Sequence, residues 1–251
     1  MEYRQHVDAV ARESSAIEAA LRAGPLDVVV PTCPDWTLAD LASHLLQFCG
    51  LWTHVICEGT DRSKPPFTDP APGEQDPGWF ADQFAEQAGH LVEMLRTTEP
   101  GTTVWTWDPA DQTAAFVGRR AAHELSVHRF DAQSTRSAPE LIDGPLAVDG
   151  IEEIFAMIRA WHAAGHTTGS TGQGDGETLH LHASDPEAEW TLTLGADGLS
   201  VDREHRKADL GLRGTASDLE LVLYDRPPLG SVEHFGDEAV LAAWHRAFHF
   251  E

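Results

Sequence analysis

Hydrophobic residues recur at helical spacing through the first 164 residues of the 251-residue chain. Apolar side chains three or four positions apart form one stripe along an amphipathic helix, and glycine and proline residues break the pattern between such stretches. Because the first four stretches are similar in length and are joined by loops, we expect an antiparallel four-helix bundle. The predicted helices span residues 3–22, 38–58, 78–97, 113–134 and 146–164.

The hydrophobic period changes after a glycine- and threonine-rich stretch at residues 167–177, whose composition is typical of a linker or loop. Apolar and polar residues alternate at 177–184 and 187–194, which predicts two β-strands, and a glycine-bearing turn leads into a third, short strand. Two helical stretches follow, at 215–226 and 237–248. This combination of strands and helices predicts a small α+β domain.

This change in the hydrophobic period predicts two domains. We expect the helical bundle to occupy residues 1–166 and the α+β domain to occupy residues 167–251. A loop rich in proline, aspartate and glycine, at residues 59–77, separates the second and third helices of the bundle. The predicted fold class is therefore a helical domain followed by an α+β domain.

A formal net charge of −24 restricts the partners of the chain. An acidic surface repels phosphates, which argues against binding to nucleic acid or to an anionic membrane surface. The sequence has no run of 18 apolar residues that would span a membrane, and its charged first residues lack the apolar core of a signal peptide. We expect a cytoplasmic protein, a monomer or weak homodimer, that acts on small molecules.

The three cysteines, Cys33, Cys49 and Cys57, give no disulfide framework, because their number is odd and none forms a CxxC motif. Such usage is typical of a reducing compartment. We interpret these residues as buried apolar thiols rather than as nucleophiles. The sequence also lacks GxGxxG, P-loop and GxSxG motifs, so nothing in it indicates a nucleotide-dependent enzyme or a serine hydrolase.

Glu124 and His128 are the first pair with metal-binding potential. They are four residues apart in the predicted helix 113–134, so their side chains lie on one face, one turn apart. A carboxylate and an imidazole in this relation can bind the same metal ion. A surface ion pair has the same spacing, so this pair alone does not decide between the two interpretations.

His44 is a third candidate ligand, and it comes from a different helix. It lies between apolar residues in the middle of the predicted helix 38–58, where a histidine is either hydrogen-bonded in the core or holds a ligand. Facing helices of a bundle commonly build metal sites. Two histidines and one glutamate leave a coordination position open, as in catalytic zinc sites. The same donors also suit Ni²⁺, Fe²⁺ or Mn²⁺.

Two further histidine pairs have chelating spacing. His162 and His166 are four residues apart where a predicted helix ends, and His180 and His182 share one face of the predicted strand at 177–184. We interpret both pairs as surface histidines, because the chain has 14 histidines and most of them must be incidental.

Three segments of the chain carry a family resemblance. CPDWTLADLASHLL, at residues 33–46, resembles the motif CPGWTVRDLVAHLAG, and RRAAHELSVHRFDAQ, at 119–133, resembles RxxAHExxVHRWDAE. GTASDLELVLYDR, at 214–226, and the FGDEAVLAAW that follows it are similar to a small C-terminal domain. These motifs are those of the mycothiol-dependent maleylpyruvate isomerase family, which the chain resembles over nearly its whole length.

The resemblance implies a DinB-like four-helix bundle followed by an α+β domain of sterol-carrier-like shape. It also implies a metal site made by His44, Glu124 and His128, the residues that spacing selects as well. Arg226 takes the motif position of a family arginine that reaches the active site, which implies a catalytic role. Asp131 matches a family aspartate that either supports the site or caps the helix.

The resemblance further implies mycothiol as a thiol cosubstrate, with zinc as the expected metal. Zinc coordination deprotonates a thiol, and the thiolate can then attack an electrophile whose carboxylate an arginine holds. Addition to a double bond, rotation and release would make the protein a cis–trans isomerase, and retention of the thiol would make it a transferase. The residues leave two alternatives open: a metal-dependent hydrolase that uses zinc-bound water, and a non-catalytic binding protein that keeps the fold.

Overall fold

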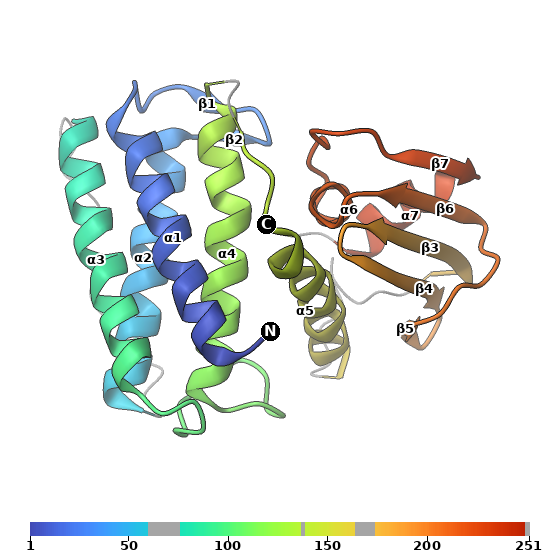
Figure 1. The fold of residues 1–251 in the computed structure, drawn as a ribbon, viewed down its shortest axis with the longest axis horizontal. Coiled ribbons are helices and arrows are strands. Elements are labelled where there is room, and N and C mark those ends of the chain that lie inside the picture. Colours follow the sequence, from blue (N-terminus) through green and yellow to red (C-terminus); the bar gives the residue numbers. More distant parts are fainter. Residues whose placement is uncertain (60–75, 137–138, 164–173, 249–251) are drawn as a thin grey trace. The chain divides into compact units, whose positions relative to one another are not determined.

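The computed structural model describes residues 1–59, 76–136, 139–163 and 174–248. The chain divides into two compact units, Met1–Glu140 and Leu141–Glu251. The first is helical and the second contains a β-sheet, which confirms the predicted fold class (Figure 1). Most of the predicted loop at 59–77 and of the predicted linker at 167–177 lies outside the described residues.

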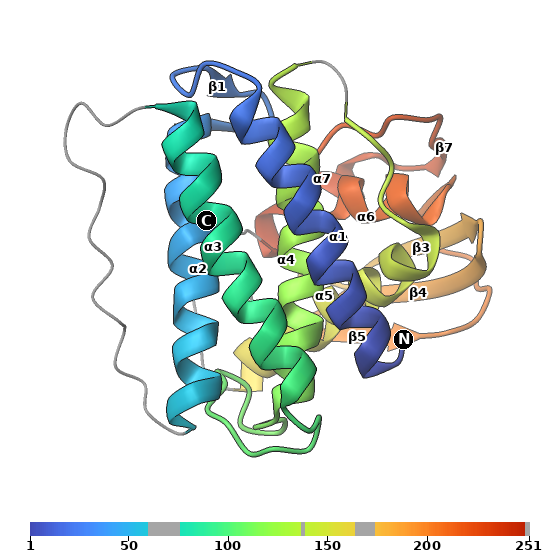
Figure 2. The same ribbon diagram turned by 60° about the vertical axis from the view of Figure 1, so that its left-hand side comes forward.

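Four long helices make up most of the N-terminal unit: α1, Tyr3–Arg22; α2, Leu38–Glu58; α3, Pro77–Thr97; and α4, Ala114–Ser134. Helices α3 and α4 each pack against both α1 and α2, so the four helices surround one core (Figures 1 and 2). Ile17, Leu45 and Phe84 are fully buried in this core. Their burial places the predicted apolar stripes on the inner faces of the helices.

Two short strands precede α2. β1, Val29–Val30, pairs antiparallel with β2, Cys33–Thr37. The amide nitrogen of Leu38 donates a hydrogen bond to the carbonyl of Val28 (2.9 Å), which ties the first turn of α2 to this hairpin. Pro31 and Pro34 favour an extended backbone in this segment, and the antiparallel pairing of the two strands fixes it.

The C-terminal unit combines three helices with a five-stranded sheet. The sheet has the order β5-β4-β3-β6-β7, and its strands pair antiparallel except for β3 and β6, which are parallel. The helices are α5, Gly144–Ala163; α6, Ala216–Leu223; and α7, Ala239–Ala247. The strands are β3, Glu177–Ser184; β4, Glu187–Gly195; β5, Gly198–Asp202; β6, Leu210–Gly214; and β7, Glu233–Gly236.

Helix α5 belongs to the C-terminal unit, whereas the sequence placed the domain boundary after residue 166. The ring of Phe155 on α5 meets the rings of Trp190 and Trp244 edge-on, at centroid distances of 6.3 and 6.4 Å. All three residues are almost fully buried, so α5 supplies part of the core that covers one face of the sheet. The division therefore lies after Glu140 and not after the fifth helix.

Strands β6 and β7 were not predicted from the sequence. Each is short, and glycines interrupt the alternation of apolar and polar residues in both. Their pairing with β3 and with each other holds them in the sheet, and such long-range pairing leaves no local signal. Across the described ranges, no helix is both long and apolar enough to cross a membrane.

Candidate metal centre

Helix α2 positions His44 because its first turn is fixed by a capping box. The side chain of Thr37 accepts a hydrogen bond from the amide of Asp40 (3.2 Å), and the Asp40 carboxylate accepts one from the amide of Thr37 (2.8 Å). These two hydrogen bonds provide acceptors for backbone amides that have no partner within the helix. His44 follows in the second turn, where 35% of its side chain is exposed.

Helix α4 presents four polar side chains on one face. Arg120, Glu124, His128 and Asp131 are separated by four, four and three residues, which stacks them along the helix. Helix α4 begins after Thr113, whose side chain caps the first turn. Each of the four is at least partly buried, so this face is directed into the protein rather than to solvent.

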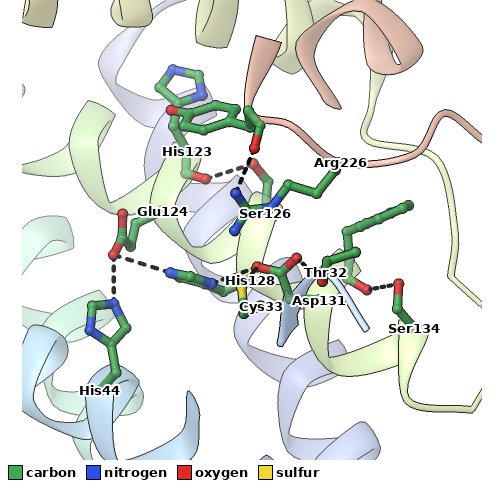
Figure 3. Close-up of polar contacts among 12 residues, drawn as sticks. Thr32, Cys33, His44, His123, Glu124, Ser126, His128, Asp131, Ser134 and Arg226 are labelled. Carbon is green, nitrogen blue, oxygen red and sulfur yellow. Dashed lines mark hydrogen bonds and ion pairs between the residues drawn. The ribbon is translucent and has the colours of Figure 1, made fainter. Parts of the chain in front are cut away.

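His44, Glu124 and His128 converge, as spacing predicted (Figure 3). Nε2 of His44 lies 2.8 Å from Oε1 of Glu124, and Nε2 of His128 lies 3.5 Å from the same oxygen. The potential ligand atoms of all three residues are within 4.8 Å of one another. Two helices that meet only through tertiary packing thus bring one carboxylate and two imidazoles to a single point.

Asp131 orients His128 from the opposite side of the ring. Its Oδ2 lies 2.9 Å from Nδ1 of His128, and its Oδ1 accepts a hydrogen bond from the hydroxyl of Thr32. The thiol of Cys33 donates to Oδ2 as well, at 3.6 Å. Asp131 is fully buried, and Figure 3 shows these contacts around it. A proton on Nδ1 leaves the Nε2 lone pair of His128 directed toward Glu124 and available to a metal.

Arg120 stabilises the negative charge of Glu124. The Arg120 guanidinium donates a hydrogen bond to Oε2 of Glu124, the oxygen that does not face the histidines. Burial opposes ionisation of Glu124, but the charge of Arg120 and the contacts with both histidines hold its pKa well below its usual range. Glu124 is therefore a carboxylate at neutral pH, and its Oε1 faces both histidines.

The electrostatics of the centre favour a cation. Burial alone would lower the pKa of His128, but hydrogen bonds with Asp131 and Glu124 raise it to about 9. The negative charges of Glu124 and Asp131 can be balanced either by a proton on His128 or by a metal ion bound between the three side chains. Metal binding must displace the proton, because only neutral imidazole is a ligand.

Trp36 forms a wall beside the three ligands. Its ring centroid lies 5.0 Å from that of His44 and 6.1 Å from that of His128, and its plane is within 26° of the His128 plane. The two imidazole rings are 4.9 Å apart, edge to face. An aromatic wall restricts both the rotation of the imidazoles and the access of water.

The three side chains fit a divalent metal. Zinc binds imidazole nitrogen and carboxylate oxygen at about 2.0–2.2 Å, so ligands on one ion are about 3–4 Å apart. The separations of 2.8 and 3.5 Å from the shared Glu124 oxygen lie close to that range. His128 also has the carboxylate partner on its second nitrogen that metal-binding histidines usually have.

Arg226, the predicted catalytic residue, lies in the C-terminal unit, just after α6. Its guanidinium donates a hydrogen bond to the carbonyl of Tyr224 (2.7 Å), and its charge lies 5.8 Å from the centroid of the Tyr224 ring. Asp225 between them adopts a left-handed backbone conformation (φ 59°), which turns the chain sharply at this point. The assignment of Arg226 stays a prediction.

The cysteines differ in their surroundings. Cys49 is buried, and burial together with the nearby charge of Glu124 raises its pKa to about 12, which removes it as a nucleophile. Cys57 is exposed, so the interpretation of this residue as a buried thiol was wrong. Cys33 is half-buried and contacts Asp131.

The other histidine pairs have different outcomes. His166 lies outside the described residues, so the pair with His162 stays a prediction. His180 was interpreted as a surface histidine, and this was wrong, since only 8% of it is exposed. The loop that follows β5 carries His205, whose ring packs on that of His180.

Sequence reasoning missed four residues of the centre: Thr32, Cys33, Trp36 and Arg120. Arg120 had a local signal, since it is one helical turn before Glu124. The other three come from the β1–β2 hairpin and depend on how this hairpin meets α4, for which a single sequence contains no periodic pattern.

Comparisons with known proteins agree with this architecture. Residues 7–133 match the family model of the mycothiol maleylpyruvate isomerase N-terminal domain, and residues 145–243 match that of the corresponding C-terminal domain. Among solved structures, a mycothiol-dependent maleylpyruvate isomerase aligns with 14% identity and a TM-score of 0.60, covering 93% of each chain. A histidine-to-alanine mutant of such an isomerase aligns with 12% identity and a TM-score of 0.61, again covering 93% of each chain. No curated protein matches the chain.

Proposed function

Because the chain belongs to the mycothiol maleylpyruvate isomerase family, we propose that it is a metal-dependent enzyme that uses mycothiol to attack a small electrophile. The observation that carries this proposal is the convergence of His44, Glu124 and His128, with their potential ligand atoms within 4.8 Å of one another. Zinc is the metal that this donor set suits best. We expect the reaction to take place in the cytoplasm.

Each residue of the centre has a defined task in this proposal. A divalent metal bound by the three ligands would hold the thiol in its deprotonated form at neutral pH. Asp131 keeps the Nε2 lone pair of His128 directed into the site, and Arg120 keeps Glu124 ionised. Trp36 limits the entry of water, which reduces competition between water and thiol for the electrophile.

We further propose that Arg226 binds a carboxylate of the substrate. Guanidinium groups hold carboxylates through two parallel hydrogen bonds, which would fix the orientation of the electrophile. This assignment rests on the motif position of Arg226 after α6.

The test is a reaction of the zinc-loaded full chain with mycothiol and maleylpyruvate, followed by mass spectrometry and NMR. An isomerase gives a product of unchanged mass with altered double-bond geometry, and a transferase gives a mycothiol adduct. Both results support the proposal if the product requires the thiol. Equal turnover without mycothiol would contradict it and would indicate a hydrolase that uses water instead.

Asp131→Asn should weaken zinc binding by about 10- to 100-fold, the usual effect of removing an outer partner of a metal-bound histidine. The substitution keeps the shape of the side chain but removes the charge that holds the Nδ1 proton of His128. Competition with a chromogenic chelator measures the affinity. Asp82→Asn, on the exposed surface of α3, is the matched control and should leave the affinity unchanged. Equal affinities in both variants would remove Asp131 from its assigned role.

A further inference from the structure

A second group of histidines lies within the C-terminal unit, on the sheet face opposite the helices. We propose that His180, Glu189 and His205 bind a divalent transition metal ion, of the Zn²⁺ or Cu²⁺ class. One potential ligand atom from each of these residues lies within 4.8 Å of the other two. The site is independent of the proposed function, since none of its residues belongs to the first centre.

Strand register places two of these ligands on one face. β3 and β4 are antiparallel, with His180 opposite Thr191 and His182 opposite Glu189. Directly opposed residues point to the same face, so the two histidines and Glu189 all project from one side. Leu181 and its partner Trp190 project from the other side, where Trp190 meets Phe155 of α5.

The loop after β5 brings the third ligand over this face. The hydroxyl of Thr191 donates a hydrogen bond to the carbonyl of Glu204 (2.9 Å), which fastens the loop one residue before His205. The ring of His205 then lies 4.6 Å from that of His180, edge to face, and its Nδ1 is 3.2 Å from Oε1 of Glu189. The cluster is therefore fixed by backbone anchoring and not by chance approach of side chains.

His180 has a buried ring nitrogen, Nε2, that could bind a metal ion. Its Nε2 is buried and has no hydrogen-bond partner within the described ranges, and an unsatisfied buried polar atom of this kind is costly and rare. Only 8% of His180 is exposed, and burial lowers its pKa, so the ring is a neutral imidazole with a lone pair to offer.

 

His182 completes the cluster by holding Glu189. Its Nδ1 contacts Oε1 of Glu189, the oxygen that also faces His205. Two imidazole nitrogens and one carboxylate oxygen suit zinc or copper rather than calcium or magnesium, which prefer oxygen ligands. The side chain of His205 is 71% exposed, so an ion can enter from solvent and keep water in its remaining positions.

The test is a calorimetric titration of the metal-free full chain with Zn²⁺. The wild type should bind two ions, and His205→Gln should bind one, because the exposed ligand is lost without disturbing the buried core. His90→Gln, an exposed histidine on α3, is the matched control and should still bind two.

The titration distinguishes a failure of the proposed function from a failure of the proposed site on the sheet. If the first centre binds no metal, the wild type binds one ion, which His205→Gln loses and His44→Ala keeps. If the proposal for the sheet is wrong, His205→Gln binds as many ions as the wild type, with the same affinity. Glu189→Gln provides a second variant, and unchanged binding in both variants would overturn the proposal.

Discussion

Replacing His128 with alanine should lower the zinc affinity of the first centre by more than about 100-fold, beyond the effect of substitutions in the outer shell. The variant loses one of the three proposed ligands, the imidazole that lies between Glu124 and Asp131. Thiol-dependent turnover should fall to the level of the uncatalysed reaction. Chelator competition and the mycothiol assay measure the two effects.

His44→Ala is the companion variant, because the more exposed position of His44 makes misfolding a smaller concern. It should lose metal and activity together while its thermal unfolding stays close to that of the wild type. Wild-type turnover in a His128→Ala protein that has lost the metal would contradict the proposed function. His90→Ala, on the surface of α3, controls for the loss of a histidine as such.

Glu13→Ala should lower the free energy of unfolding by about 3–5 kcal/mol, the range for breaking a buried ion pair from one side. Glu13 on α1 pairs with Arg129 on α4, and both side chains are 4% exposed. The substitution leaves the guanidinium buried, with Gln133 and the carbonyl of Glu140 among its remaining partners. Urea unfolding followed by circular dichroism measures the change.

Glu18→Ala on the same helix is the matched control. Glu18 pairs with Arg22 at the surface, where 34% of the Glu18 side chain and 46% of the Arg22 side chain are exposed. Pairs of this kind contribute at most about 0.5 kcal/mol. A loss below about 1 kcal/mol for Glu13→Ala would show that water or other groups solvate Arg129 in the variant.

The helices could be predicted because their signals are local. Apolar spacing predicted α1 and α2 with their observed bounds. The candidate metal ligands on α4 could be predicted for the same reason, since helical spacing alone places Glu124 and His128 on one face. His44 needed a further argument, from its position among apolar residues and from the family motif.

The remaining features depend on long-range contacts. Thr32 reaches Asp131 across 99 positions of sequence, and α5 joins the C-terminal unit through Phe155 and two distant tryptophans. The burial of His180 depends on a loop fastened by Thr191. The sequence carries no periodic pattern that indicates any of these contacts. It therefore predicts neither the domain boundary nor the second histidine cluster.

The stacking of Arg120, Glu124, His128 and Asp131 along α4 makes the centre sensitive to insertions and deletions. One residue added between Glu124 and His128 would rotate the imidazole by about 100° and remove it from the site. Substitutions on the other faces of the helix leave this register intact. We therefore expect the centre to tolerate substitutions at exposed positions of α4 but no change in the number of residues between Glu124 and His128.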